Sequence, residues 1–379
     1  MTAPRIFRAP GRVNLIGEHT DYNLGFVLPI ALDLATYIET APSDDGQLHV
    51  WSEDRREEHA WPVDSIASVK PTKQWSDYIA GVAKELALRG MEIQPLNLKI
   101  RSDVPVGAGL SSSAALEVSI AFALLQGRDF PRLEIARLCQ KAESEFVGMP
   151  CGIMDQFVAV FGHENAAICL DCRSLEYQQV ELPRDLEIVA VNSMVKHDLG
   201  VSAYRTRVAE CAIAVDAIRR RFPEVRSLRD ATTAQLDKSM MPRTAMRRAR
   251  HVIGENRRVE LFVHAAERHD RGRMGELFVE SHRSMRHDYE ITCDEVDFLV
   301  DVAVGEPGCF GARMTGGGFG GCTVNLLEPG AYESFVRSIR SRYQERFGID
   351  PSIFRCVPAA GAGEIDAGEK VEKGPFIAG

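Results

Sequence analysis

A loop rich in glycine and serine, at residues 105–115, constrains the fold most, because a predicted strand precedes it and a predicted helix follows it. Apolar and polar residues alternate over 96–101, which is the pattern of a strand with one buried face. Apolar residues then recur at helical spacing over 116–124. A helix N-terminus presents unpaired backbone N–H groups that attract phosphate, and glycines allow close backbone approach. The loop therefore predicts a nucleotide phosphate site, with a simple serine-capped helix as the alternative.

This loop differs from a Walker loop, since no Gly-Lys-Ser/Thr follows at the required spacing. Serine hydroxyls can serve both phosphate oxygens and a metal ion. The candidate nucleotide-binding residues of the loop are Gly107, Gly109, Leu110, Ser111, Ser112 and Ser113.

The length of 379 residues predicts two domains, which we place at residues 1–180 and 181–379. A net charge of −9 argues against a nucleic-acid partner, and the sequence has no apolar run long enough for a membrane span or a signal peptide. The odd number of scattered cysteines favours reduced thiols over a disulfide framework. We therefore expect a cytoplasmic protein with small-molecule partners, either a monomer or a weak homo-oligomer.

A second polar segment, at residues 11–23, follows a short predicted strand at 6–8 that Ala9-Pro10 is expected to end. It is bounded by glycines and flanked by apolar strands, an arrangement typical of a binding loop on a rigid scaffold. A solvated turn is the alternative. The ionisable candidates in this segment are Arg12, Glu18, His19 and Asp21.

Four further residues are ambiguous from local pattern alone. Trp75 and Tyr78 lie one turn apart on an amphipathic helix predicted over 75–86, where aromatic residues usually belong to the core. Glu143 lies beside the apolar stripe of a helix that begins at Pro131, and a buried carboxylate there is rarely idle. Asp155 lies in the first turn of another predicted helix, where the helix dipole alone explains an acid.

Several segments together resemble the galactokinase family of the GHMP small-molecule kinases. The phosphate loop is shared across that superfamily, whereas Gly-Glu-His-Thr-Asp-Tyr at residues 17–22 is specific to galactokinases and their nearest relatives. The resemblance covers nearly the whole chain. The segments that carry it are residues 11–22, 105–115, 151–156, 281–290 and the glycine-rich run at 311–322.

The resemblance implies an α+β fold of two lobes with the active site in the cleft between them. It also implies transfer of the γ-phosphate of ATP to the anomeric hydroxyl of D-galactose, with Mg²⁺ held by Ser113 and Glu143. Asp155 is the implied catalytic base, and Trp75 and Tyr78 are implied to lie near adenine, which replaces their interpretation as core residues. The residues implied for the sugar site are Arg12, Glu18, His19, Asp21, Gly152 and Tyr204.

One departure from the family pattern follows Tyr204, where this chain reads Arg205-Thr206-Arg207 in place of two adjacent arginines. Two alternative functions stay open at this point. The first is a kinase for a galactose-like sugar, such as N-acetylgalactosamine, galacturonate or arabinose. The second is a sugar sensor that has lost catalysis, against which the intact residues Asp155 and Glu143 argue.

Overall fold

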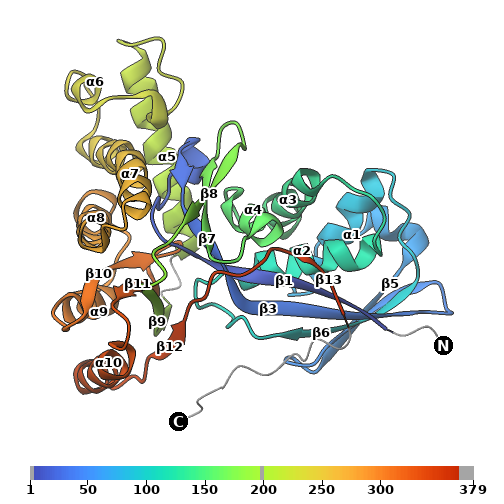
Figure 1. Ribbon diagram of the computed structural model, residues 1–379. Coiled ribbons are helices and arrows are strands. Elements are labelled where there is room, and N and C mark those ends of the chain that lie inside the picture. The colour runs from blue at the N-terminus through green and yellow to red at the C-terminus, as the bar shows by residue number, and fades with distance from the viewer. Residues whose placement is uncertain (1–3, 197–199, 367–379) are drawn as a thin grey trace.

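The computed structural model describes residues 4–196 and 200–366, which form two lobes (Figure 1). One lobe is a broad sheet with helices on one side, and the other is a smaller sheet with a large helical layer. This arrangement confirms the expected α+β class. In the part of the chain that is described, no helix is both long and apolar enough to cross a membrane.

The larger sheet has six strands, and the pairing of β4 with β6 is its one parallel pair among the described residues. The remaining neighbours are antiparallel. Strand β6 buries alternate residues, as its sequence pattern predicts. In order across the sheet, the strands are β13 (Gly363–Ile365), β1 (Arg5–Asn14), β3 (Pro29–Pro42), β6 (Leu96–Ser102), β4 (Gln47–Ser52) and β5 (Glu57–Pro62).

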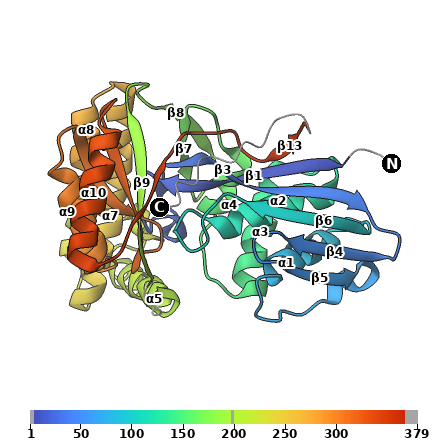
Figure 2. The ribbon, with the colours of Figure 1, turned by 90° about the horizontal axis from the view of Figure 1, so that it is seen from below.

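Four helices cover one face of this sheet and leave its other face open (Figure 2). Their apolar side chains pack with those of the sheet in one buried cluster. The glycine–serine loop leads directly into α2, as its flanking patterns predict. The helices are α1 (Asp77–Leu88), α2 (Ser112–Leu125), α3 (Arg132–Lys141), which continues into the π-helical turn Ala142–Val147, and α4 (Met154–Phe161).

Strand β1 continues beyond the point where the sequence predicts its end. The expectation that Ala9-Pro10 ends the strand is wrong, because the pairing with β3 runs on to Asn14 after a register shift between Pro10 and Arg12. A bulge tolerates proline, which cannot donate to the ladder. Arg12 and Asn14 therefore project from a rigid strand, and only the residues after them form a loop.

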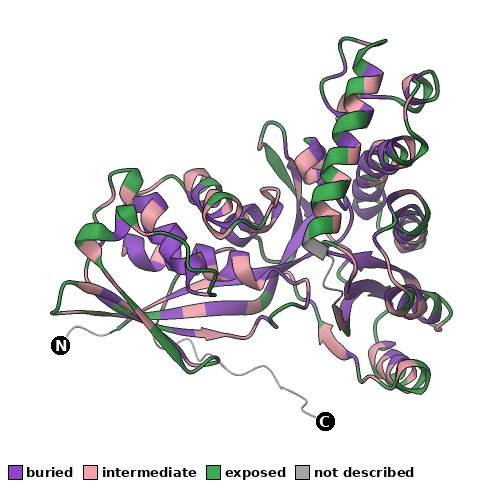
Figure 3. Ribbon diagram, turned by 180° about the vertical axis from the view of Figure 1, so that it is seen from behind, coloured by how far each residue is buried: buried purple, intermediate pink, exposed green. Residues whose placement is uncertain are grey.

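The smaller sheet forms the centre of the second lobe, where its strands are largely buried (Figure 3). The glycine-rich run at 311–322 belongs to two paired strands of this sheet and the turn between them. The strands, in order across the sheet, are β10 (Cys309–Thr315), β11 (Gly320–Leu327), β9 (Glu187–Lys196) and β12 (Ser352–Arg355). The helices of this lobe are α5 (Gly200–Arg219), α6 (Thr233–Asp237), α7 (Arg243–Glu267), α8 (Arg271–Ser284) with the π-helical segment Met285–Tyr289, α9 (Asp294–Val304) and α10 (Tyr332–Phe347).

A third, three-stranded sheet is built from β2 (Phe26–Val27), β7 (Ala166–Asp171) and β8 (Tyr177–Glu181). Strand β8 is mostly exposed, and only Val180 of the strand is buried. The domain boundary near residue 180 stays a prediction. The chain after β12 returns to the first lobe, where β13 pairs with β1. Three short 3-10 turns complete the described elements: η1 (Asp21–Asn23), η2 (Val63–Ser68) and η4 (Leu228–Asp230).

The contact between α8 and β10 provides a test of this packing. A Cβ on Gly275 would lie 1.9 Å from the carbonyl oxygen of Phe310, whereas a Cβ on Gly272 of the same helix would meet nothing closer than 3.7 Å. We expect Gly275→Ala to lower the free energy of unfolding by about 1–3 kcal/mol, because the helix and strand must separate. Gly272→Ala is the control and should be neutral or stabilising. Urea denaturation measures both, and equal effects would contradict the packing argument.

Candidate active site between the lobes

A cavity of about 120 Å³ lies between the lobes and collects every residue that the resemblance implies for the sugar site. Asp155 lines the same cavity, together with Gly316 and Gly317 from the turn between β10 and β11. Segments far apart in the sequence therefore meet as expected. The lining residues named from the sequence are Arg12, Glu18, His19, Asp21, Gly152 and Tyr204.

Arg12 and Asp155 form a two-point ion pair at the inner end of this cavity. Arg12 Nε and Nη2 each donate to one Asp155 carboxylate oxygen at 2.8 Å, and Arg12 Nη1 donates to the Gly109 carbonyl at 2.6 Å. The Ser111 hydroxyl donates to Asp155 Oδ2 at 2.5 Å. Ser111 has a left-handed φ of 59° at the N-cap of α2. The phosphate loop is thus bonded directly to the Asp155 carboxylate.

Asp21 and Gly152 also line this cavity and lie against each other. A Cβ at position 152 would lie 1.8 Å from Asp21 Oδ2, so the site leaves room for Asp21 only because residue 152 is glycine. Burial, with the nearby Asp155 and Glu18 carboxylates, raises the pKa of Asp21 to about 6. The surroundings of Asp21 therefore disfavour the charged form of its side chain.

Glu18 is buried, and both of its oxygens already accept hydrogen bonds. Oε1 accepts from the Gly316 backbone N–H at 2.9 Å, and Oε2 accepts from Asn14 Nδ2 at 2.9 Å and from Arg313 Nη2 at 3.0 Å. Sequence reasoning missed Arg313, which is fully buried on β10. No local pattern marks it, because its partners lie about three hundred residues away in the chain.

A second cavity, of about 620 Å³, lies beside the phosphate loop. Gly107, Ser112 and Ser113 line it together with Trp75 and Tyr78, so the structure brings the two aromatic residues to the loop. Sequence reasoning missed Arg55, which lines this cavity and lies 5.4 Å from the Trp75 ring centroid.

The other three loop residues named from the sequence face elsewhere. The Gly109 carbonyl and the Ser111 hydroxyl are bonded to Arg12 and Asp155, respectively. Leu110 is fully buried in the core shared by the two lobes. One half of the loop therefore faces the large cavity and the other half faces the ion pair.

The donors named for magnesium are Ser113, on the loop itself, and Glu143, in the π-helical turn that follows α3. The Glu143 carboxylate is hydrogen-bonded to Ser113, and burial together with Asp155 raises the Glu143 pKa to about 7. Gln156 Nε2 donates to Glu143 at 2.6 Å and to the fully buried Glu117 at 3.0 Å. A cation would relieve this crowding of carboxylates, and Mg²⁺ needs only one or two protein oxygens. The residues present therefore fit the ion, although no cluster of three His, Cys, Asp or Glu suited to a metal occurs among the described residues.

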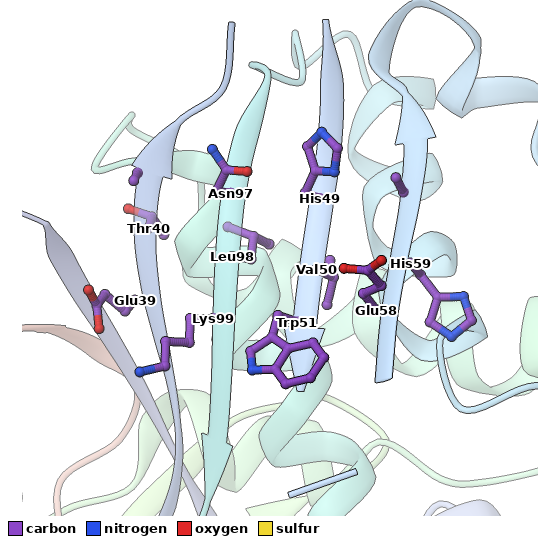
Figure 4. A pocket seen from close by; sticks show the side chains of 12 residues that line it. Glu39, Thr40, His49, Val50, Trp51, Glu58, His59, Asn97, Leu98 and Lys99 are labelled. Atoms are coloured by element: carbon purple, nitrogen blue, oxygen red, sulfur yellow. The ribbon is translucent and has the colours of Figure 1, made fainter. Parts of the chain in front are cut away.

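A larger hollow, of about 690 Å³, lies on the open face of the six-stranded sheet (Figure 4). Trp51 of β4 lies there between Glu58 of β5 and Lys99 of β6, its partners in strand register. None of the residues assigned to a site from the sequence lines this hollow. The larger volume is therefore not the site that the motifs build.

Comparison with known proteins places the fold in a class. The family models "GHMP kinases N terminal domain" and "GHMP kinases C terminal" match residues 77–163 and 262–345. A solved mevalonate kinase superposes with a TM-score of 0.66 at 18% identity, over 93% of this chain and 98% of that chain, and so shares the fold. The fold and the phosphate loop together define a GHMP kinase.

Further comparisons identify the family within this class. The "Galactokinase galactose-binding signature" matches residues 2–42. Galactokinases of Roseiflexus sp. (strain RS-1) and Chloroflexus aggregans are 43% and 44% identical to this chain, over 95% and 97% of its length and 93% and 95% of theirs. A Lactococcus lactis galactokinase solved with galactose superposes with a TM-score of 0.92 at 34% identity, over 96% of each chain. The chain belongs to the galactokinase family of ATP-dependent sugar kinases.

The raised pKa of Asp21 predicts a pH-dependent cost in stability. Its pKa rises from 3.8 to about 6 on folding, so the stability that protonated Asp21 allows is present below pH 4 and is lost as pH rises through 6. We expect Asp21→Asn to raise the free energy of unfolding by about 1–2 kcal/mol at pH 8 and by less at pH 5. Urea denaturation at the two pH values measures this, with the exposed Asp64→Asn as control. A gain independent of pH would refute the assignment.

Proposed function

We propose that the protein transfers the γ-phosphate of ATP to the anomeric hydroxyl of D-galactose, giving galactose 1-phosphate and ADP. One observation carries this proposal: Asp155 lines the small cavity and is also hydrogen-bonded to the phosphate loop through Ser111. A carboxylate in that position can act on a hydroxyl in one cavity while the loop holds a phosphate in the other. Phosphoryl transfer asks for this positioning more than for covalent chemistry.

ATP would bind in the cavity of about 620 Å³ beside the phosphate loop, with its phosphates at the N-terminus of α2. Gly107, Ser112 and Ser113 line this cavity beside backbone N–H groups of the helix end, which favour anions. Trp75 and Tyr78 would flank the adenine. Gly109, Leu110 and Ser111 would shape the loop from behind, through the bonds to Arg12 and Asp155 and through the packing of Leu110.

Asp155 would orient the galactose hydroxyl and accept its proton. Three donated hydrogen bonds, two from Arg12 and one from Ser111, fix the position and orientation of the carboxylate. Arg12 would also spread the negative charge that develops during transfer. The positive charge and the base therefore belong to one preorganised pair.

The remaining cavity residues would recognise the sugar. Asp21 is a strong acceptor for sugar hydroxyls, and Gly152 leaves the space for its carboxylate. Tyr204 contacts the His19 ring, with a centroid separation of 5.4 Å, and closes the cavity from α5. Glu18 would act mainly through the Gly316 N–H that it holds. A site built to pair with a hydroxyl discriminates strongly against the sugar that lacks or inverts it.

Ser113 and Glu143 would hold Mg²⁺ against the nucleotide. Bound there, the ion would supply charge neutralisation to the phosphate oxygens. The chain's own contribution is to keep the Glu143 carboxylate in place through Gln156.

We also propose that the protein works in the cytoplasm as a monomer or a weak homo-oligomer, with its substrates as its partners. All nine cysteines are free thiols, which suits a reducing compartment.

A panel of sugars tests the proposed function. With ATP and magnesium, we expect ADP release with galactose and at least about 10²-fold less with glucose, because one inverted hydroxyl leaves buried polar groups unpaired. Asp155→Asn tests the role of the carboxylate. This variant should lose about 10²-fold or more of the turnover while still binding galactose. A preference for N-acetylgalactosamine, galacturonate or arabinose would replace the proposed substrate. Galactose binding without ADP release would indicate a sensor.

The metal assignment is tested by titrating magnesium. We expect Glu143→Gln and Ser113→Ala to raise the magnesium concentration needed for half-maximal activity by about tenfold, because each removes one of the two protein donors. Glu145→Gln lies in the same π-helical turn but is exposed, and it serves as the control. Direct titration of the nucleotide complex with Mn²⁺, followed by its paramagnetic signal, gives a readout that is independent of activity. Unchanged affinities in both variants would refute the assignment.

A further inference from the structure

A closed ring of hydrogen bonds runs from His19 into the helical layer of the second lobe. His19 Nδ1 lies 2.9 Å from Tyr22 Oη, which lies 2.6 Å from Tyr289 Oη, which lies 3.2 Å from Cys211 Sγ. The Asn23 amide closes the ring, because its Nδ2 donates both to Cys211 Sγ at 3.8 Å and to the His19 carbonyl at 2.8 Å. The ring joins the sugar motif to α5 and to the π-helical segment Met285–Tyr289.

The direction of the protons in this ring follows from its fixed acceptor. His19 Nε2 lies 3.3 Å from the Gly317 carbonyl, which can only accept, so Nε2 carries the hydrogen. In a neutral ring Nδ1 is then an acceptor, and Tyr22 must donate to it. A hydroxyl has one hydrogen, so Tyr22 accepts from Tyr289, and Tyr289 accepts from the Cys211 thiol.

The electrostatics keep His19 neutral, as this direction requires. Burial, and then the neighbouring His251 and the Arg207 guanidinium, lower the His19 pKa to about 3. The carbonyl of Gly317 opposes this shift but does not outweigh it. Both ring nitrogens are therefore occupied, and His19 has no free position for proton transfer.

Tyr289 is held in place without any help from a sugar. It is fully buried, its carbonyl accepts from Arg207 Nε at 2.7 Å, and its ring lies 4.5 Å from the His251 ring. His251 in turn contacts the Glu18 carbonyl at 3.1 Å. His19 has a left-handed φ of 59°, which is uncommon for a non-glycine residue. The hydrogen bonds of the ring stabilise this backbone conformation.

We propose that Tyr22 and Tyr289 are positioning residues for sugar recognition, acting by holding His19 as the Nε2–H tautomer against Gly317. This inference rests on the proposed function, because the wall that His19 and Gly317 form lines the cavity assigned to galactose. Glu18 fixes the adjacent Gly316 from the other side. The two hydroxyls therefore set the position of a cavity wall without touching the sugar.

The test compares three Tyr→Phe variants that each lose one hydroxyl. Tyr22→Phe and Tyr289→Phe open the ring, whereas Tyr343→Phe removes a buried hydroxyl that donates to the Ser193 carbonyl at 2.9 Å, outside the ring. We expect the first two to raise the KM for galactose by about 3- to 10-fold and to leave the KM for ATP within about twofold. Tyr343→Phe should change neither. Tyr22 is only partly buried, so its variant keeps the test decisive if Tyr289→Phe does not fold.

Histidine ¹⁵N NMR of the sugar-free protein gives the second readout. We expect the His19 signals of the wild type and Tyr343→Phe to show a protonated Nε2 and an unprotonated Nδ1, and those of Tyr22→Phe to show a mixture of tautomers. A protonated Nδ1 in the wild type, or an unchanged galactose KM in both ring variants, overturns the proposal. If the wild type prefers another sugar, the proposed function fails separately, and the same KM comparison is made with that sugar.

Discussion

The ion pair between Arg313 and Glu18 is fully enclosed by protein and joins the two lobes at 3.0 Å. A buried pair becomes more favourable when its remaining polar groups are also paired, and among the described residues every guanidinium nitrogen of Arg313 except Nε has a partner. Arg313 Nη1 donates to the carbonyls of Asn14 and Leu15, and Glu18 also accepts from Asn14 and Gly316. Removing Arg313 would leave the Glu18 carboxylate without its cation in the core, and removing Glu18 would leave Arg313 with only the more distant Glu255 carboxylate, at 4.0 Å. The end of β1 and the turn between β10 and β11 are therefore fixed relative to each other, and the cavity proposed for the sugar lies at this junction.

Strand β1 positions the phosphate loop and Asp155 relative to this ion pair. Arg12 and Asn14 are two residues apart, so they project from the same face of the strand. Arg12 reaches Asp155 and the phosphate loop, while Asn14 reaches Glu18. A single strand thus sets the separation between the carboxylate that would act on the sugar and the loop that would hold the phosphates. A flexible loop in its place would let that separation vary, and phosphoryl transfer depends on it.

Local sequence patterns predict those parts of the fold that local forces decide. Alternation predicts β6, and the helical spacing over 116–124 predicts a helix that lies within α2. The continuation of β1 past Pro10 depends on its pairing with β3, and no pattern within the strand records its partner. The density of polar residues at 11–23 indicates a site, but it cannot show that Glu18 accepts hydrogen bonds from Arg313 of β10 and from the Gly316 N–H that follows this strand.

Residues that act from a distance in the sequence are the hardest to predict. Arg313, Glu117 and Tyr289 are buried polar groups whose partners come from other elements, and each looks like an ordinary helix or strand residue in its own segment. The resemblance covers the segments that contain Tyr289 and Arg313, but it assigns a role to neither residue. Only the three-dimensional packing identifies it.

The residues of the cleft do not by themselves neutralise all of its buried acids. Asp21 and Glu143 both have raised pKa values because burial and the Asp155 carboxylate disfavour their charged forms. Arg12 is committed to Asp155, so it does not neutralise the other two acids. Sugar hydroxyls can donate to Asp21, and a cation carried with the nucleotide can neutralise Glu143. Each ligand would therefore stabilise the charged form of one of these two carboxylates, and binding of both ligands would stabilise both.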